Sequence, residues 1–241
     1  TVKTIGEGAF SYCSTLTQVE SSIDSQLTEI ENKAFEATSI NEILIPASVL
    51  SIENSVFNNC YKLKKVEFTE DSNLTKIGKY CFNNTNIEQF TVPKNVLIIE
   101  RGTFHIFIKL KNIDFQKDSK LQKICESAFK DCLFEKISIP ASVICIEQYP
   151  FSKKVKKIDI PTDSKIQTFQ SLAFKGTSIK SLLIPPLVKI LDANIFFECH
   201  NLQIIEIAEN SQLEQFSLSD LKNVIIMTPS FLMNSVKINY K

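Results

Sequence analysis

The chain has 241 residues, 44% of them hydrophobic, and its 27 basic residues balance 27 acidic ones. The formal net charge of zero leaves no overall field that would recruit nucleic acid or an anionic membrane. No run of 18 apolar residues occurs, so we expect no direct membrane insertion in this segment, although the apolar fraction is ample for a folded core.

A phenylalanine returns along almost the whole chain at intervals of 22 to 25 residues. The positions are Phe10, Phe35, Phe57, Phe82, Phe104, Phe129, Phe151, Phe174 and Phe196. The intervals run 25, 22, 25, 22, 25, 22, 23 and 22, so two repeat types alternate and the true unit is a pair of about 47 residues. Fixed periods of this size are typical of solenoids, in which each repeat buries its apolar face only against its neighbours.

Each phenylalanine lies between two further apolar elements. Five positions earlier stands an aliphatic or aromatic residue: Ile5, Ile30, Ile52, Ile77, Ile99, Ile124, Ile146, Phe169 or Leu191. Four to six positions later begins a short run with apolar residues at its positions 1, 4 and 6. The ten runs start at Leu16, Ile40, Leu63, Ile87, Leu110, Phe134, Val155, Ile179, Leu202 and Leu221. We expect about ten parallel strands on one face and helical or 3₁₀ turns on the other, an α/β-type solenoid.

The two repeat types differ in the turn after the run. Type-one repeats continue with an Asp or Asn followed by Ser, as in Asp71-Ser72, whose side chains bond nearby backbone amides. Type-two repeats continue with Pro, as at Pro46, which lacks an N–H and ends a strand. We interpret residues 1–241 as a single solenoid, a fragment of a longer array that opens without Met, with residues 216–241 as a divergent terminal unit.

The segments Ile45–Ile52 with Phe57–Cys60, and Ile5–Phe10 with Cys13–Leu16, resemble the BspA-like (Treponema pallidum type) leucine-rich repeat family. The resemblance covers residues 1 to about 215. It implies a leucine-rich repeat fold and a surface antigen associated with adhesion to host matrix proteins and cells. The departures are Phe107 and Lys154 at the Cys position and Pro150 before Phe151, which predict irregularity near residues 105–110 and 148–156.

Four of the seven cysteines stand three positions after a phenylalanine, at Cys13, Cys60, Cys132 and Cys199. Threonine takes this place at Thr38, Thr85 and Thr177, so the column predicts a small residue that bonds a tight turn. Successive cysteines in it lie at least two coils apart, beyond disulfide reach. The count is odd and no Cys-x-x-Cys pair occurs. We therefore expect seven free, structural cysteines, with no metal and no cofactor.

The chain contains no motif for catalysis. It has two histidines, His105 and His200, and five glycines, with no phosphate-binding loop and no hydrolase motif. We expect no catalytic residues and no enzyme activity. Asn73 and Asn83 begin Asn-x-Thr sequons, and their use as glycosylation sites stays open.

Positions 2, 3 and 5 of the runs are expected to face solvent on the inner curve of the solenoid. Lysines gather at positions 2 and 3, including Lys222, and type-one repeats place an acid at position 5. The candidate protein-binding face consists of Lys64, Lys65, Glu67, Lys111, Asp114, Lys136, Lys156, Lys157, Asp159 and Lys180. Two interpretations stay open: a solvated face whose charges balance each other, and a ligand surface.

The leading hypothesis is a monomeric, non-enzymatic protein-binding or adhesion module, on the cell surface or secreted, that recognises a matrix or host-cell protein. The alternative is a cytoplasmic leucine-rich repeat scaffold that binds a regulatory protein through the same face. Free thiols and the lack of a signal peptide in this segment motivate the alternative.

Overall fold

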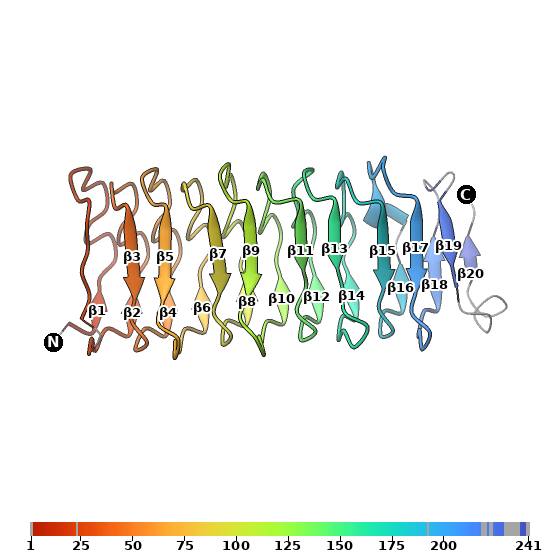
Figure 1. Cartoon of the computed structure of the whole chain (residues 1–241), viewed down its shortest axis with the longest axis horizontal. Helices are drawn as coiled ribbons and strands as arrows, with labels where there is room; N and C mark the ends of the chain where they lie inside the picture. The colour runs from red at the N-terminus through yellow and green to blue at the C-terminus, as the bar shows by residue number, and fades with distance from the viewer. Residues whose placement is uncertain are drawn as a thin grey trace.

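The computed structural model describes residues 2–22, 24–191, 193–217, 221, 224–228 and 237–239. They form a parallel β-solenoid of about nine turns. Figure 1 shows the coils stacked in a nearly straight row, with the N-terminus at one end and the C-terminus at the other. Each coil contributes a strand to two sides of the stack, which we name the long-strand face and the short-strand face.

The long-strand face carries the runs that the sequence predicted as strands. Its strands are β3 (Glu42–Ile45), β5 (Lys65–Phe68), β7 (Gln89–Val92), β9 (Asn112–Phe115), β11 (Lys136–Ser138), β13 (Lys157–Asp159), β15 (Ser181–Ile184), β17 (Ile204–Ile207) and β19 (Ile225–Met227). The run at Leu16 forms no strand, although the carbonyl of Thr17 still accepts the N–H of Asn41 at 3.2 Å. The prediction of parallel strands is confirmed for the other nine runs.

The short-strand face was not predicted. It consists of β1 (Thr4–Ile5), β2 (Glu29–Ile30), β4 (Ser51–Ile52), β6 (Lys76–Ile77), β8 (Ile98–Ile99), β10 (Lys123–Ile124), β12 (Cys145–Ile146), β14 (Thr168–Phe169), β16 (Ile190–Leu191), β18 (Gln215–Ser217) and β20 (Lys237–Asn239). The strands β1 to β14 of this face form one continuous eight-stranded sheet. The apolar residue five positions before each phenylalanine is the second residue of such a strand and points into the core.

The predicted α/β character is not confirmed, because the described residues contain a single helix, the 3₁₀ helix η1 (Ala193–Phe196). In every phenylalanine turn a residue with positive φ stands two positions before the phenylalanine, two positions after it, or both. These residues are Gly8, Tyr12, Lys33, Ala37, Ser55, Asn59, Tyr80, Asn84, Gly102, Ile106, Ser127, Asp131, Tyr149, Leu172, Gly176 and Glu198. A left-handed residue every fourth position interrupts any right-handed helix.

The phenylalanine turns also divide their hydrogen bonds differently from a helix. The N–H groups of Gly8, Phe10 and Tyr12 donate to the next coil, at carbonyl distances of 2.8–2.9 Å. The N–H groups between them, such as that of Ala9, donate within the turn. Alternate amides therefore join neighbouring coils on this side as well, as in a sheet.

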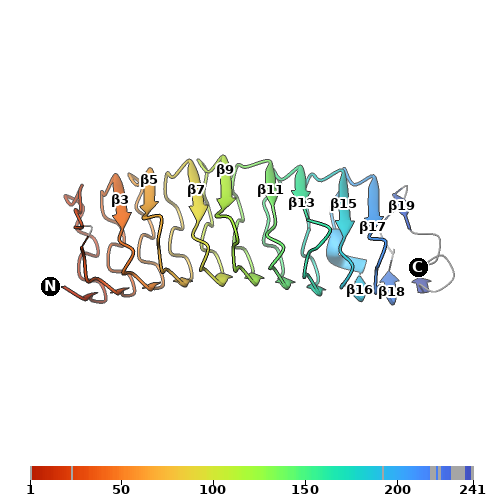
Figure 2. The same ribbon diagram turned by 60° about the horizontal axis from the view of Figure 1, so that its bottom comes forward.

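This arrangement explains why the solenoid is nearly straight. Packed helices lie about 8–10 Å apart, whereas paired strands lie about 4.8 Å apart, so coils with a helix on one side are wedge-shaped. Here the strands of both faces and the phenylalanine turns are joined to neighbouring coils by backbone hydrogen bonds at strand spacing. The predicted inner curve is therefore wrong, and Figure 2 shows the long strands along one long side of the stack.

The core is a ladder of phenylalanine rings. The nine rings from Phe10 to Phe196 stack in sequence, with centroids 5.3–6.3 Å apart and ring planes within 17° of parallel. Phe10 is 40% exposed, whereas the rings of the following coils are buried. In the segment near 105–110, where the sequence predicted irregularity, Phe107 packs edge-to-face on Phe104, with centroids 5.4 Å apart. The larger ring therefore fills the core where other repeats have Cys or Thr.

The long-strand face is divided into two-coil units. Hydrogen-bonded sheets join β3 to β5, β7 to β9 and β11 to β13, and a three-stranded sheet joins β15, β17 and β19. The hydrogen-bonded sheet is interrupted after β5, β9 and β13, which are the strands of type-one repeats. The sheets therefore agree with the predicted pair of alternating repeats. In the last pair of strands, Ile204 of β17 lies opposite Ile225 of β19. Ile204 is position 3 of its run, whereas a run beginning at Leu221 makes Ile225 position 5, so the tenth run begins two residues later than predicted. Much of the predicted terminal unit 216–241 lies outside the described residues.

Candidate protein-binding face

The structure brings all ten candidate residues onto the long-strand face between β5 and β15. Four lysines stand directly before strands β5, β9, β13 and β15: Lys64, Lys111, Lys156 and Lys180. Lys65, Lys136 and Lys157 begin β5, β11 and β13, and Glu67, Asp114 and Asp159 are the third residues of β5, β9 and β13. Apolar residues alternate with them, as Val66 does in β5, so the charged side chains point to solvent.

Most of these lysines already have a carboxylate partner. The pairs are Lys65–Glu67, Lys111–Glu88, Lys136–Asp159, Lys156–Glu135 and Lys157–Asp159, at 2.5–3.0 Å between nitrogen and oxygen. The lysine side chains in these pairs are 57–65% exposed. Exposed pairs of this kind contribute about 0–1 kcal/mol each, so they order the surface more than they stabilise the fold.

The ion pairs keep both partners charged near neutral pH. The hydrogen bond from Lys111 lowers the pKa of Glu88, and the hydrogen bond to Glu67 raises the pKa of Lys65. Partial burial opposes ionisation of Asp159, but hydrogen bonds from Lys157 and Lys136 prevail and lower the pKa of its carboxyl group. The face therefore presents fixed rows of both signs rather than a basic stripe.

Three candidate residues are without an ion pair among the described residues: Lys64, Asp114 and Lys180. Lys222, which was predicted to continue the lysine row, lies outside the described residues. The unpaired charges are thus spread over the length of the face, where a partner with complementary charges can reach them without first breaking a pair.

Apolar side chains gather at the β15–β19 end of the face, which the sequence indicated only in part. Ile225 and Met227 are 61% and 55% exposed, beside the half-buried Leu183 and Ile204. An open pocket of about 870 Å³ includes Leu183, Glu206 and Met227 in its lining. Met227 was missed because the register of β19 differs by two residues from the predicted one.

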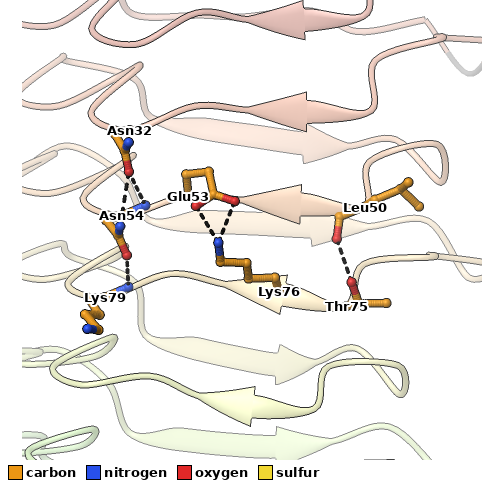
Figure 3. Close-up of polar contacts among 7 residues, drawn as sticks. All are labelled: Asn32, Leu50, Glu53, Asn54, Thr75, Lys76 and Lys79. Carbon is orange, nitrogen blue, oxygen red and sulfur yellow. Dashed lines mark hydrogen bonds and ion pairs between the residues drawn. The ribbon is translucent and has the colours of Figure 1, made fainter.

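Polar side chains on the short-strand face have structural partners in neighbouring coils (Figure 3). The Oδ1 atom of Asn32 accepts the backbone N–H and the Nδ2 of Asn54, and the Oδ1 atom of Asn54 accepts the N–H of Lys79 at 2.8 Å. Lys76 pairs with Glu53 at 2.6 Å. These groups hold successive coils together.

Most of the cysteines are buried. All seven cysteines are unpaired. Burial raises the pKa of Cys60 and Cys199, and raises that of Cys125 to about 12, so their reactive thiolate is scarce at neutral pH. The described residues contain no group of three or more potential metal ligands.

No helix in the described part of the chain has the length and apolar character needed to cross a membrane.

The two sequons differ in access. Asn73 is exposed, and Thr75 two residues later is exposed as well. Asn83 is half-buried, its Nδ2 donates to the Oδ1 of Asn58 at 2.8 Å, and Thr85 is buried. The Nδ2 of Asn73 also donates to a neighbouring coil, at 3.1 Å from the carbonyl oxygen of Ala47, so the two sequons differ in exposure and not in having a contact between coils.

Comparison with known proteins identifies the class. The family model described as BspA type leucine rich repeat region (6 copies) matches residues 1–106 and 75–203. The chain therefore belongs to the BspA-type leucine-rich repeat family, whose repeats are suited to protein interaction. No curated protein matches the chain.

Solved structures show the same fold at low identity. A leucine-rich repeat protein from Bacteroides ovatus is 21% identical, with a TM-score of 0.73 over 98% of this chain and 66% of that one. A leucine rich cell surface protein from Faecalibacterium prausnitzii is 22% identical, with a TM-score of 0.50 over 95% and 70%. The pneumococcal vaccine antigen PcpA is 21% identical, with a TM-score of 0.51 over 90% and 72%. The chain thus spans just under two thirds of the Bacteroides protein.

Proposed function

We propose that the chain is a non-enzymatic adhesion module that binds a matrix or host-cell protein through the long-strand face. The supporting observation is the surface itself: charged side chains of both signs stand in rows at strand spacing along β5 to β15, with exposed apolar residues at one end. Such a surface combines steering charges with apolar anchors.

The proposed location is the cell surface or the extracellular space. It is supported by membership of the BspA-type family and by relatives of the same fold that are described as a cell surface protein and a vaccine antigen. Labelling of intact native cells with an impermeant amine reagent tests the location. Labelling before lysis supports it, whereas protection until lysis contradicts it.

A second candidate function is an intracellular scaffold that binds a regulatory protein. Seven unpaired cysteines, most of them buried, favour it because reducing compartments preserve free thiols. The same labelling experiment separates the two candidates, since a scaffold is protected in intact cells.

The face is tested by reversing the charge of Lys64, Lys111 and Lys156 to Glu in one variant. Matched control substitutions are Lys76→Glu, Lys123→Glu and Lys189→Glu on or beside the short-strand face, where each lysine pairs with a carboxylate as Lys111 and Lys156 do. Binding to a panel of immobilised matrix proteins is measured by biolayer interferometry. We expect at least a tenfold loss in the first variant and little change in the control. Equal binding by both variants would exclude the long-strand face, and no binding by the unmodified chain would contradict adhesion.

A further inference from the structure

The coil that contains Phe151 is one residue short on its turn side. Four positions separate Phe151 from the apolar residue Val155, whereas both neighbouring coils have five. The coil closes early, with the N–H of Val155 donating to the carbonyl of Ser152 at 3.1 Å. Lys153 also lacks the positive φ that Asp131 has at the same position of the preceding coil. The shortened turn leaves a notch between the two longer turns beside it.

This notch is a defined pocket. Its volume is about 470 Å³, and its lining includes three lysines, Lys130, Lys153 and Lys175, and two carboxylates, Asp131 and Glu198. The volume falls within the range of sites for small ligand groups. The pocket lies at the phenylalanine turns, away from the lysine rows of the long-strand face.

The notch concentrates cationic groups that have few partners. Lys130 and Lys153 form no ion pair among the described residues, and Lys175 reaches only Glu198, at 3.9 Å. The Lys175 ammonium lies 5.5 Å from the ring centroid of Tyr149 and 5.0 Å from that of Phe197. Its side chain is 29% exposed, so the rings hold a partly desolvated charge in place.

One further polar group is available at the floor. Ser152 is 5% exposed, and its hydroxyl oxygen accepts the N–H of Lys154 at 3.2 Å. The hydroxyl proton has no acceptor among the described residues and can be donated to a ligand. Tyr149 and Phe151 add apolar surface beside it. The pocket thus offers ammonium groups, one hydroxyl donor and an apolar wall, while its two carboxylates lie near basic side chains, Glu198 at 3.9 Å from Lys175 and Asp131 at 3.6 Å from His105.

We propose that the notch binds the carboxylate of an acidic side chain presented by a protein ligand. Carboxylates are the groups with which this molecule repeatedly pairs lysines between coils, as in Lys111–Glu88 and Lys156–Glu135. The methylene groups of a glutamate would pack on the aromatic wall while its carboxylate meets Lys130 and Lys153 at the rim. That the carboxylate comes from a protein rests on the proposed function. The notch would give this protein a second contact, on a side of the solenoid other than the long-strand face.

The test is a titration of the isotope-labelled chain followed by NMR. The probe is N-acetylglutamate N-methylamide, and the matched control compound is the corresponding glutamine derivative. With the probe at up to about 50 mM, where millimolar affinities become visible, we expect saturable shifts at the amides of Ser152, Lys153 and Gly176. The glutamine compound should cause none. Absence of saturable shifts, or equal shifts with both compounds, would overturn the proposal.

Variants and a second probe locate the site and its ligand class. Lys130→Met combined with Lys153→Met should weaken binding at least tenfold, while Lys154→Met, next to the pocket but outside its lining, should not. Saturable shifts with glucuronate and none with the glutamate compound would contradict a protein ligand and indicate an acidic sugar. Because no partner protein is needed, this result is independent of the binding test on the long-strand face.

Discussion

The thiol of Cys60 donates a hydrogen bond to the carbonyl oxygen of Phe35 at 3.0 Å, across the boundary between two coils. The hydroxyl of Thr38 donates to the same oxygen, also at 3.0 Å. The arrangement recurs where Cys199 and Thr177 share the carbonyl of Phe174. The Cys and Thr column that the sequence predicted as turn-bonding is thus a set of buried links between adjacent coils.

Replacing Cys60 by Ala should therefore destabilise the chain by about 1–2 kcal/mol, because a buried carbonyl loses a donor and a small void remains. Cys60→Ser keeps a donor and should lose less. Urea unfolding followed by circular dichroism measures the difference. Cys13→Ala is the matched control, since Cys13 holds the same column position but is exposed, and it should change stability by less than about 0.5 kcal/mol. Equal effects at both positions would contradict the role of the shared carbonyl.

The phenylalanine ladder should be most sensitive in the middle of the stack. Phe82 is fully buried, and its ring lies 5.4 Å from that of Phe57 and 5.9 Å from that of Phe104, so Phe82→Ala should cost about 3–5 kcal/mol. Phe10 is 40% exposed and stacks on one side only, so Phe10→Ala should cost less than half as much. Unfolding midpoints in urea compare the two. Similar losses would show that the ladder is not the main source of stability between coils.

The sequence predicted the columns well because the period is fixed. Once the phenylalanines were aligned, the inward residues of both strands followed, and Ile30, Ile52 and Ile77 are buried as their common position indicated. The sequence also contains a signal for the ion pairs between coils, in the alternating charge at position 2 of successive runs. The residues at this position are Glu88, Lys111, Glu135 and Lys156. They are far apart in the sequence and become neighbours only when the coils stack, as in the pairs Lys111–Glu88 and Lys156–Glu135.

The shape of the turns could not be predicted in the same way. Residues as different as Lys33, Tyr80 and Leu172 have positive φ at the same position of the turn. None of them favours that conformation locally, so residue preference gave no signal. Hydrogen bonds to the next coil hold the backbone there, as from the N–H of Lys33 to the carbonyl of Asn54 at 3.0 Å. The straight stack and the notch at Phe151 both depend on these turns.

Gly102 tests whether the turn geometry is required. Its φ is +63°, and an added Cβ would lie 2.4 Å from the Tyr80 ring, so Gly102→Ala combines backbone strain with a clash. We expect a loss of at least about 2 kcal/mol in urea unfolding. Gly6→Ala is the control, because its nearest contact would be 3.8 Å from the Glu31 carboxylate and its φ is not positive. It should be neutral or slightly stabilising, and a comparable loss there would contradict the explanation.

Asp159 should make stability depend on acid pH. Lys136 and Lys157 hydrogen-bond its carboxylate at 3.0 and 2.9 Å, and against the opposing effect of partial burial they lower its pKa in the folded chain. The unfolded chain therefore binds this proton more tightly. The stabilisation is complete above the unfolded pKa of about 3.9 and is lost as the pH falls through the lower folded value.

Asp159→Asn should accordingly destabilise the chain at pH 7, by less than about 1 kcal/mol because the side chain is 34% exposed and the pairs are screened. The difference from the unmodified chain should shrink as the pH falls below the unfolded pKa of about 3.9 and vanish below the lower folded pKa, where both chains lack the charge. Urea midpoints at a series of pH values measure it. Asp114→Asn is the control, since Asp114 holds the same strand position without an ion pair among the described residues, and it should cost less stability at pH 7 than Asp159→Asn. A gap for Asp159→Asn that stays constant from pH 7 to acid would mean that the two lysines do not stabilise the ionised carboxylate.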